Sequence, residues 1–486
     1  MKNILKYKLY VCIFIIAVII LNTVFISGCG IITKGSNLTS TEELSLSSDN
    51  YKRSDIYIDN TANAASAETQ SVLNSFETAE TLDTPGTPDT ISAKERALQT
   101  SSSNNTNTEQ SSYNTEQNSN TERSSVDTPD GTTRLSFIAA GDNIMHSNMI
   151  DDAKERATNG ENFDFIDMYK GVADIIKSAD IALVNVETPI AGDEFAYTGY
   201  PNFNTPKEDA FALMDIGFDI INTANNHMLD LKEKGYMNSI NFWDSQKNYN
   251  GGDILQIGSF KDRDDFENIR IYRKDGISIA FLSYTYGTNG MVLPDGSKMI
   301  VPIIDDATVE RQIKAARPLA DLLFVVMHWG TEDSFTPDPW QKSLAQMMVD
   351  DGVDVIIGMH PHVLQEAKWV DRPDGKKTLL AYSIGNFISG MLGAQNMVGA
   401  LLGFDIVKTT QNGGSSVSIE NAQVIPVVTQ YNLQRKGFQI YRFEDYTEDL
   451  AKQHGCIKSD PKFSYQYLKD LITKNIAPEF LSDFYK

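Results

Sequence analysis

Two histidines separated by one residue follow directly on a short apolar run, Ile356-Ile357-Gly358-Met359-His360-Pro361-His362. A run of this length is typical of a buried strand, which would carry both imidazoles to the rim of a sheet. Five of the six histidines lie at or just past such runs: His146, His227, His328, His360 and His362. We therefore expect these five, with nearby Asp, Glu and Asn, to form one polar site at one sheet edge. The sixth, His454, is expected at the surface.

The first 29 residues have the pattern of a secretory signal. Lysines at the start precede an apolar run, residues 9–26, and small residues follow it. Cys29 comes directly after Ser27-Gly28, as in a bacterial lipobox, so the pattern resembles a lipoprotein signal in which Cys29 is lipidated. An uncleaved membrane anchor is the alternative, because the run approaches the length of a bilayer span. Either interpretation places the rest of the chain outside the cytoplasmic membrane and tethered to it.

Residues 30–133 are rich in Ser, Thr, Asn and acidic residues. Such a segment cannot bury enough apolar surface to offset the entropy of ordering, so we predict a disordered linker. Cys456 is the only cysteine after this linker, so no disulfide is expected in the globular part. The net charge of −23 argues against nucleic-acid binding, which depends on neutralising phosphates.

From residue 134 onward, apolar runs of strand length alternate with longer helical patterns, and hairpins follow. This order predicts an α/β layered domain with a mixed sheet over residues 134–430. Residues 431–486 are predicted to form a helical C-terminal extension. The predicted strands cover residues 134–140, 181–186, 218–223, 322–327 and 353–358, with hairpin pieces at 269–284, 365–370, 378–383, 400–408 and 416–425. The predicted helices cover residues 163–178, 207–216, 231–246, 308–316 and 339–350.

A polar motif follows each of six predicted strands, where ligand sites of such folds lie. Carboxylate, amide and imidazole groups suit divalent metals such as Mn, Zn and Fe, and a pair of ions sharing a carboxylate needs about seven ligands. The candidate ligands are Asp142, Glu187, Asn226, His328, His360 and His362. Residues of the same motifs that are predicted to contact substrate are Asn185, Asn225, Trp329, Glu332 and Asn386. Ordinary packing of loops around the sheet edge is the alternative for these.

The series Gly-Asp…His, Asn-x-Glu, Asn-Asn-His, His-Trp-Gly, Gly-x-His-Pro-His and Gly-Asn-Phe resembles the CapA family of capsule synthesis proteins. That family, also called PgsA-like, is associated with poly-γ-glutamate and is related to the calcineurin-like metallophosphoesterases. The match covers about residues 134–430. The resemblance implies a layered α/β/β/α sandwich with mixed sheets, anchored on the outer side of the membrane.

The metallophosphoesterase pattern also implies roles for matching residues. Asp142 stands at the first metal's carboxylate, and Glu187 stands where that superfamily usually has a bridging Asp one methylene shorter. Asn226 resembles a ligand of the second metal, with His227 as the candidate general acid. His328 and His360 look like the second metal's imidazoles, and His362 looks like one of the first metal's.

His146 departs from this pattern, because the superfamily's histidine follows its Asp by two residues and His146 follows Asp142 by four. It is a candidate seventh ligand, a substrate contact or a helix cap. Three functions stay open. The first is a tethered metal-dependent hydrolase or transferase acting on an anionic surface polymer such as poly-γ-glutamate. The second is a non-catalytic accessory subunit of a membrane synthase complex, and the third is a phosphoesterase unrelated to capsule.

Overall fold

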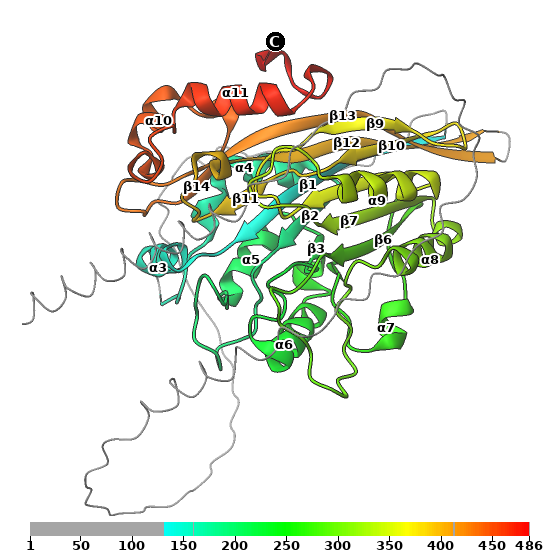
Figure 1. The fold of residues 1–486 in the computed structure, drawn as a ribbon, viewed down its shortest axis with the longest axis horizontal. Helices are drawn as coiled ribbons and strands as arrows, with labels where there is room; N and C mark the ends of the chain where they lie inside the picture. The colour runs from blue at the N-terminus through cyan, green and yellow to red at the C-terminus, as the bar shows by residue number, and fades with distance from the viewer. Residues whose placement is uncertain (1–130, 159, 412–413, 486) are drawn as a thin grey trace, which may run out of the picture. The chain divides into compact units, whose positions relative to one another are not determined.

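The computed structural model describes residues 131–158, 160–411 and 414–485. The predicted signal and lipid site at Cys29, and nearly all of the predicted linker, lie outside the described residues. Within them, strands and helices alternate and hairpins follow, as expected (Figure 1). No helix of this part of the chain is both long and apolar enough to cross a membrane.

The first sheet has eight strands in the order β14-β13-β12-β1-β2-β3-β4, with β11 also paired to β1. Strand β1 is parallel to β2 and β11 and antiparallel to β12, so the sheet is mixed. Its strands are β1 (Thr132–Ile144), β2 (Ile181–Val186), β3 (Ile220–Asn222), β4 (Leu255–Ile257), β11 (Asn386–Ser389), β12 (Val398–Gln411), β13 (Gly414–Gln430) and β14 (Gln439–Arg442).

The second sheet has six strands in the order β5-β6-β7-β8-β10-β9. The four inner strands run parallel, and β5 and β9 are antiparallel edges. Strands β6, β7 and β8 are buried throughout, as their continuous apolar runs predict for parallel strands covered on both faces. The strands are β5 (Arg270–Lys274), β6 (Ile277–Thr285), β7 (Leu322–His328), β8 (Val355–Met359), β9 (Ala367–Asp371) and β10 (Lys377–Ala381).

Helices connect the parallel strands and cover the sheets. Helix α9 begins where Asp338 and Gln341 form a capping box and Pro339 occupies the first turn. The helices are α3 (Ser147–Arg156), α4 (Ile166–Ser178), α5 (Lys207–Asp215), α6 (Lys232–Ser245), α7 (Arg263–Glu267), α8 (Asp306–Ala316), α9 (Pro339–Asp350), α10 (Glu448–Gln453) and α11 (Tyr465–Asn475).

Alternate residues of β7 show the layering directly. Phe324 belongs to the core between the sheets, where its ring meets Phe137 of β1 edge-on at 5.3 Å between centroids. Leu323 points to the other face, into a cluster with Ile313 of α8 and Leu344 of α9. Because successive side chains of a strand alternate between faces, the second sheet separates the inner core from these helices. The predicted α/β/β/α sandwich with mixed sheets is confirmed.

The C-terminal extension packs on the same core. Its first element is a strand, β14, which pairs with the end of β13, so the extension is not helical throughout. Phe438, Leu468 and Ile472 are buried in the cluster that also holds the sheet residues. The expectation of a surface His454 is wrong. This side chain is fully buried, its Nε2 lies 2.8 Å from the carbonyl of Thr429, and its Nδ1 accepts the amide of Cys456.

Candidate metal centre

Four polar side chains form a row in register across neighbouring strands of the first sheet. Asn386 of β11 pairs with Asp142 of β1, which pairs with Asn185 of β2, which pairs with Asn222 of β3. Two hydrogen bonds connect three of them, from Asn185 Nδ2 to Asp142 Oδ1 at 2.7 Å and from Asn222 Nδ2 to Asn185 Oδ1 at 2.8 Å. Ser283 of the second sheet donates to Asn222, so the row joins both sheets. Asp142 is thereby held rigidly at the end of β1.

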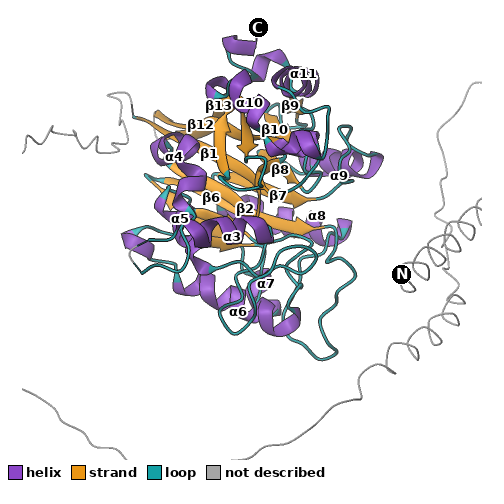
Figure 2. Ribbon diagram, turned by 90° about the vertical axis from the view of Figure 1, so that its left-hand side faces the viewer, coloured by secondary structure: helices purple, strands orange, loops and turns teal. Residues whose placement is uncertain are grey.

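The histidine pair of the second sheet meets this row. Asp142 Oδ2 accepts the backbone amide of His360 at 3.1 Å and lies 3.2 Å from His362 Nδ1. Both histidines have left-handed backbone conformations, with φ of 93° for His360 and 56° for His362. Such conformations are uncommon for residues with a side chain and cluster where function demands a particular geometry. The turn after β8 therefore brings both rings to the carboxylates of Asp142 and Glu187. Figure 2 shows the strands of the two sheets, β1, β2, β7 and β8 among them, at the centre of the domain.

Glu187 lies at the centre of the cluster and is almost fully buried. Its Oε1 is 3.8 Å from both His328 Nε2 and His362 Nε2. Neither carboxylate oxygen has a hydrogen-bond partner among the described residues, and the Nδ1 atoms of His328 and His360 also lack one. A buried carboxylate with no donor is costly, because desolvation is not compensated. These orphaned atoms suit a cation.

The ligand atoms fall into two groups, each lying within 4.8 Å of one another. One group contains Glu187, His360 and His362, and the other contains Asp142, Glu187 and His328. Glu187 belongs to both, which is the position of a bridging ligand. Nitrogen and oxygen donors of this kind, with no thiolate, fit divalent metal ions. Ligation by these residues stays a prediction, and the structure brings them together.

Asn226 extends the cluster from the loop after β3. Its Oδ1 lies 2.9 Å from His328 Nε2, and its Nδ2 donates to Asn289 Oδ1 at 3.2 Å. The amide oxygen therefore faces the imidazole with which it is predicted to share an ion. Asn289 lies in a loop outside the six motifs, with φ of 52°, and orients Asn226; no sequence pattern singles it out.

The protonation of the cluster reflects the crowding of its charges. Burial, reinforced by Asp142, raises the pKa of Glu187 well above its usual range. Burial lowers the pKa of His328 and of His360 well below the usual value, so both rings are neutral and keep a lone pair. Burial also opposes charge on His362, but the carboxylates of Glu187 and Asp142 outweigh it and raise its pKa to about 10.

His227 lies beside the cluster with one ring nitrogen held. Its Nδ1 is 2.8 Å from Asp230 Oδ2, and that oxygen also accepts the amide of Phe203 at 2.8 Å. A carboxylate on Nδ1 keeps the proton there in the neutral ring and orients the other nitrogen, Nε2. Asp230 follows the Asn-Asn-His motif closely, but the sequence alone does not predict a role for it. Its position three residues after His227, in a turn, was the available signal.

His146 lies just before α3 and outside both groups of ligand atoms. Its Nδ1 accepts the amide of Gly390 at 3.1 Å, and it makes no side-chain cap on α3. Its ring meets Phe203 edge-on at 5.5 Å, and Phe203 meets His227 at 4.7 Å. The structure thus does not place His146 among the ligands, and a substrate contact stays a prediction.

The residues predicted to contact substrate mostly support the site. Asn185 donates to Asp142 and accepts a hydrogen bond from Asn222, so both of its polar side-chain atoms are occupied. Asn225 donates to the carbonyl of Val186 and accepts the amide of His227. Trp329 is fully buried and donates to the carbonyl of Tyr382. Asn386 Oδ1 lies 2.9 Å from His362 Nδ1 and therefore orients that ring.

Two side chains remain at the mouth of the site. Glu332, predicted to contact substrate, is exposed and adds negative charge near Glu187 and His362. Tyr286 follows β6 and stacks at a tilt over His360, with ring centroids 4.4 Å apart and 37% of the residue exposed. Tyr286 is therefore the aromatic side chain that a ligand of this site would meet.

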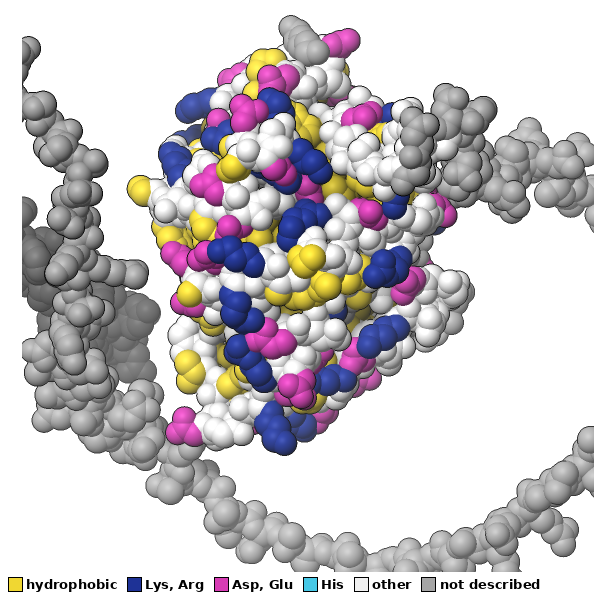
Figure 3. Space-filling model, turned by 90° about the vertical axis from the view of Figure 1, so that its right-hand side faces the viewer, with side chains coloured by type: hydrophobic (Ala, Val, Ile, Leu, Met, Phe, Trp, Pro, Cys, Tyr) yellow, Lys and Arg dark blue, Asp and Glu magenta, His cyan; other side chains and the backbone are white. Residues whose placement is uncertain are grey.

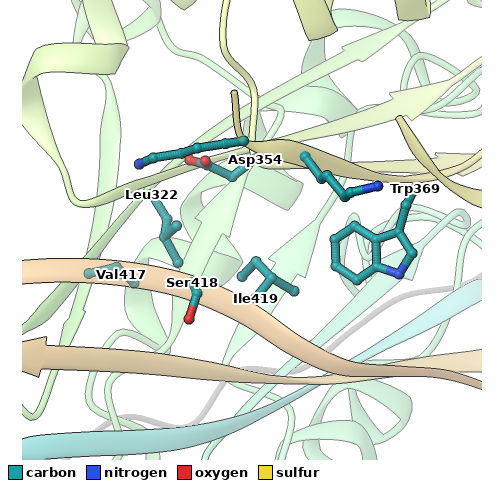
Figure 4. Close-up of a pocket in the computed structure, with 8 residues that line it drawn as sticks. Leu322, Asp354, Trp369, Val417, Ser418 and Ile419 are labelled. Carbon is teal, nitrogen blue, oxygen red and sulfur yellow. The ribbon is translucent and has the colours of Figure 1, made fainter. Parts of the chain in front are cut away.

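A separate cavity of about 580 Å³ lies away from the histidines, with Trp369 and Ile419 on its walls (Figure 4). It includes Leu322, the first residue of β7, and is therefore at the opposite ends of the strands from His328. Its carboxylate, Asp354, is already paired with Arg317 and Arg372. Figure 3 shows a face with interspersed Lys, Arg, Asp and Glu and no visible histidine. The cavity offers no comparable chemistry.

The family of this chain follows from a family model that matches its sequence. The family model described as "Bacterial capsule synthesis protein PGA_cap" matches residues 136–391, just over half of the chain. The chain belongs to this family. The predicted relationship to CapA-type capsule synthesis proteins is thereby confirmed.

Curated relatives agree with this membership. The chain is 26% identical over 343 residues to "Capsule biosynthesis protein CapA" of Bacillus anthracis, covering 68% of this chain and 77% of that one. It is 29% identical over 246 residues to "PGA biosynthesis protein CapA" of Bacillus subtilis, covering 48% and 59%. A "probable polyglutamine synthesis accessory protein" of Mycobacterium tuberculosis is 22% identical over 278 residues, covering 53% and 68%.

Among solved structures, the chain is similar to the NAD nucleotidase of Haemophilus influenzae, with a TM-score of 0.37, 15% identity and coverage of 72% of this chain and 64% of that one. It is also similar to the calcineurin-like phosphoesterase YfkN of Bacillus subtilis, with a TM-score of 0.33, 12% identity and coverage of 60% and 91%. Neither similarity bears on the reaction.

Proposed function

We propose that this member of the capsule synthesis family is a membrane-anchored, extracytoplasmic, metal-dependent hydrolase that processes an anionic surface polymer such as poly-γ-glutamate. The observation that carries the proposal is Glu187, whose two buried oxygens have no protein donor and lie between two groups of ligand atoms. Mn, Zn or Fe would suit these donors. The names of the relatives, which refer to capsule, PGA and polyglutamine synthesis, support the choice of polymer.

Two divalent ions would supply the positive charge that polarises the substrate and activates water in a hydrolytic site. Glu187, His360 and His362 would hold one ion, and Asp142, Glu187 and His328 would hold the other, with Asn226 beside His328. These groups pair the histidines differently from the family pattern, which places His360 with His328 and His362 with Asp142. His227 would donate a proton from Nε2 to the leaving group, because Asp230 holds its Nδ1. Tyr286 would contact the substrate at the mouth.

Turnover by the purified full chain, loaded with Mn or Zn, tests the enzyme proposal. We expect cleavage of γ-linked polyglutamate, and a loss of about 100-fold or more in kcat for His227→Ala, since general acids typically contribute that much. Asp215→Asn is the matched control, because it changes an exposed carboxylate at the end of α5. Failure to cleave either γ-glutamyl polymer or phosphoesters, with unchanged capsule in cells carrying His227→Ala, contradicts the enzyme proposal.

A non-catalytic accessory subunit is the second candidate, and the printed name of the mycobacterial relative favours it. Such a subunit would bind metal or polymer and assist a membrane synthase complex without turnover. Pull-down of the full chain from membranes, with polymer binding but no cleavage, would support this candidate. Cleavage of γ-glutamyl polymer by the isolated chain would exclude it.

Anchoring through Cys29 rests on the lipobox-like Ser27-Gly28-Cys29 alone. Cells expressing wild type or Cys29→Ser, labelled with a clickable fatty acid, test it. Lipid label and membrane recovery should both depend on Cys29. Equal labelling of the two forms contradicts lipidation at this residue, and membrane retention without any label supports the alternative of an uncleaved anchor.

A further inference from the structure

The cavity of about 580 Å³ lies between the two sheets, at the strand ends opposite the histidines. One wall comes from the first sheet, with Val417 and Ile419 of β13. The facing wall comes from the second sheet, with Leu322 of β7 and Trp369 of β9 (Figure 4). Sites that hold small organic ligands have volumes of roughly 300–1,000 Å³, so this space is large enough for one.

The walls of the cavity continue the apolar core between the sheets. Leu322 is buried in that core, and Trp369, Val417 and Ile419 pack against it while remaining partly exposed. Apolar surface that is left open in this way gains free energy when an apolar group covers it. The cavity therefore favours a ligand with an apolar body.

Two lysines, Lys376 and Lys377, also line the cavity, and both are exposed to solvent. Lys377 pairs with Asp371 at 3.1 Å. Lys376 has no ion pair within the part of the chain that the structure describes, since the nearby carboxylate of Asp374 is paired with Arg372. A ligand that enters the cavity can therefore reach positive charge at its edge.

No free carboxylate of the lining opposes these lysines. Asp354 is the one acidic residue among the lining residues, and it forms ion pairs with both Arg317 and Arg372. Its Oδ2 also accepts the amide of Leu323 at 2.8 Å. In a chain of net charge −23, this cavity thus presents unpaired positive charge, which attracts anions.

We infer that the cavity is a binding site for a small amphipathic anion, with its apolar body between the sheets and its single anionic group at Lys376 and Lys377. A polymer charged on every unit would have to place unpaired charges against apolar walls, which is costly. A membrane surface cannot fill a space between two sheets. The site is separate from the metal centre, so it is independent of the proposed function.

Binding of 8-anilinonaphthalene-1-sulfonate to the purified full chain, followed by the fluorescence of this probe, tests the site. The probe combines apolar rings with one negative charge, and decanoate should displace it. Acetate lacks the apolar body and should compete at least about tenfold less well. Decanol lacks the charge and should compete at least about threefold less well.

Two pairs of substitutions isolate the role of the lysines. Lys376→Gln with Lys377→Gln should weaken the probe and decanoate at least about threefold, as expected for two solvent-exposed ion pairs, and should leave decanol unchanged. Lys342→Gln with Lys462→Gln is the matched control, because it removes the same charge from exposed residues outside the cavity lining. The control should bind all three compounds as the wild type does.

Filling the cavity tests its position. Ile419→Trp should abolish displaceable probe binding, with thermal unfolding by circular dichroism confirming the fold, and Val417→Phe serves if that variant unfolds. Unchanged binding in a folded, filled variant overturns the inference, and so does equal affinity in the two lysine pairs. Probe binding that phosphatidylglycerol vesicles displace and decanoate does not would indicate a membrane-binding surface and also overturns it. None of these measurements needs a metal ion, so they stand whether or not the proposed function does.

Discussion

Asp230 is the single residue on which the role of His227 depends. It holds His227 Nδ1 at 2.8 Å and is itself held by the amide of Phe203. Asp230→Asn keeps the shape of the side chain. Its amide group, however, can present an N–H to His227 Nδ1, which needs an acceptor. We expect kcat to fall about 10–100-fold with ion content unchanged, which is typical when an orienting partner is lost. Kinetics and elemental analysis of the same preparation check this, and Asp215→Asn, a surface change, serves as the control. An unchanged kcat would show that Asp230 does not orient an acid.

The buried carboxyl group of Asp209 makes the stability of the fold depend on pH. Burial raises the pKa of this carboxyl from 3.8 to about 7, against hydrogen bonds from Tyr169 and Asn143. The folded state therefore holds one more proton than the unfolded state between these values. The free energy of unfolding therefore falls by about 2–3 kcal/mol as the pH rises from 5 to 7.

Urea unfolding at pH 5 and pH 7 measures this effect. Asp209→Asn should shrink the difference in the free energy of unfolding between the two pH values by that amount. Asp215→Asn should leave the difference as it is in the wild type. A pH difference that is the same in wild type and Asp209→Asn means that Asp209 does not carry the extra proton.

The residues of the site were predictable to different degrees. The sequence singles out the candidate metal ligands and general acid, because carboxylate, amide and imidazole groups rarely gather at strand ends. These residues are Asp142, Glu187, Asn226, His227, His328, His360 and His362. Supporting residues such as Asn222, Asn289 and Asp230 did not. Asn, Ser and Asp are frequent in loops and turns for other reasons, so only the three-dimensional register reveals their partners.

At the scale of elements, the positions of His360 and His362 depend on how closely β8 packs against the residue that follows β10. An added Cβ on Gly358 would lie 1.9 Å from the carbonyl oxygen of Tyr382 and 2.6 Å from Trp329 Nε1. The backbone must therefore move, and overpacking of this kind costs about 1–3 kcal/mol.

We expect Gly358→Ala to lower the free energy of unfolding by about that amount and to reduce ion content, because the turn after β8 shifts. Gly287→Ala is the matched control, since a Cβ there meets nothing within 4 Å. Denaturant titration and elemental analysis provide the measurements. Full stability and full ion content in Gly358→Ala would show that this close approach does not set the site.

Most of the longer elements were predicted, whereas helix α3 and three of the shortest strands were missed. Residues 181–186 and 339–350 have the predicted bounds, because continuous burial and a clear cap define them. Strands β4, β11 and β14 have only three or four residues each. Runs this short carry no periodicity, and their pairing depends on contacts distant in sequence.

At the scale of the whole molecule, residues after Gln430 belong to the folded unit. Phe438, Ile440, Phe443, Leu468 and Ile472 are all buried in the main core. Each buried side chain of this kind contributes about 1.5–3 kcal/mol, so together they match the whole stability of a typical domain. Truncation after Gln430 should therefore abolish cooperative unfolding by circular dichroism. Removal of residues 483–486 alone should preserve it. A stable product ending at Gln430 would make the extension dispensable.

The ion content of the purified full chain tests the central claim most directly. Glu187 belongs to both groups of ligand atoms, so Glu187→Gln should affect both ions while hardly changing side-chain volume. We predict about two divalent ions per wild-type chain, as in other two-metal sites, and a clear loss in Glu187→Gln and His360→Ala but not in Glu332→Gln. A wild type without bound ions after metal loading, or equal ion content in all four proteins, would contradict the metal centre.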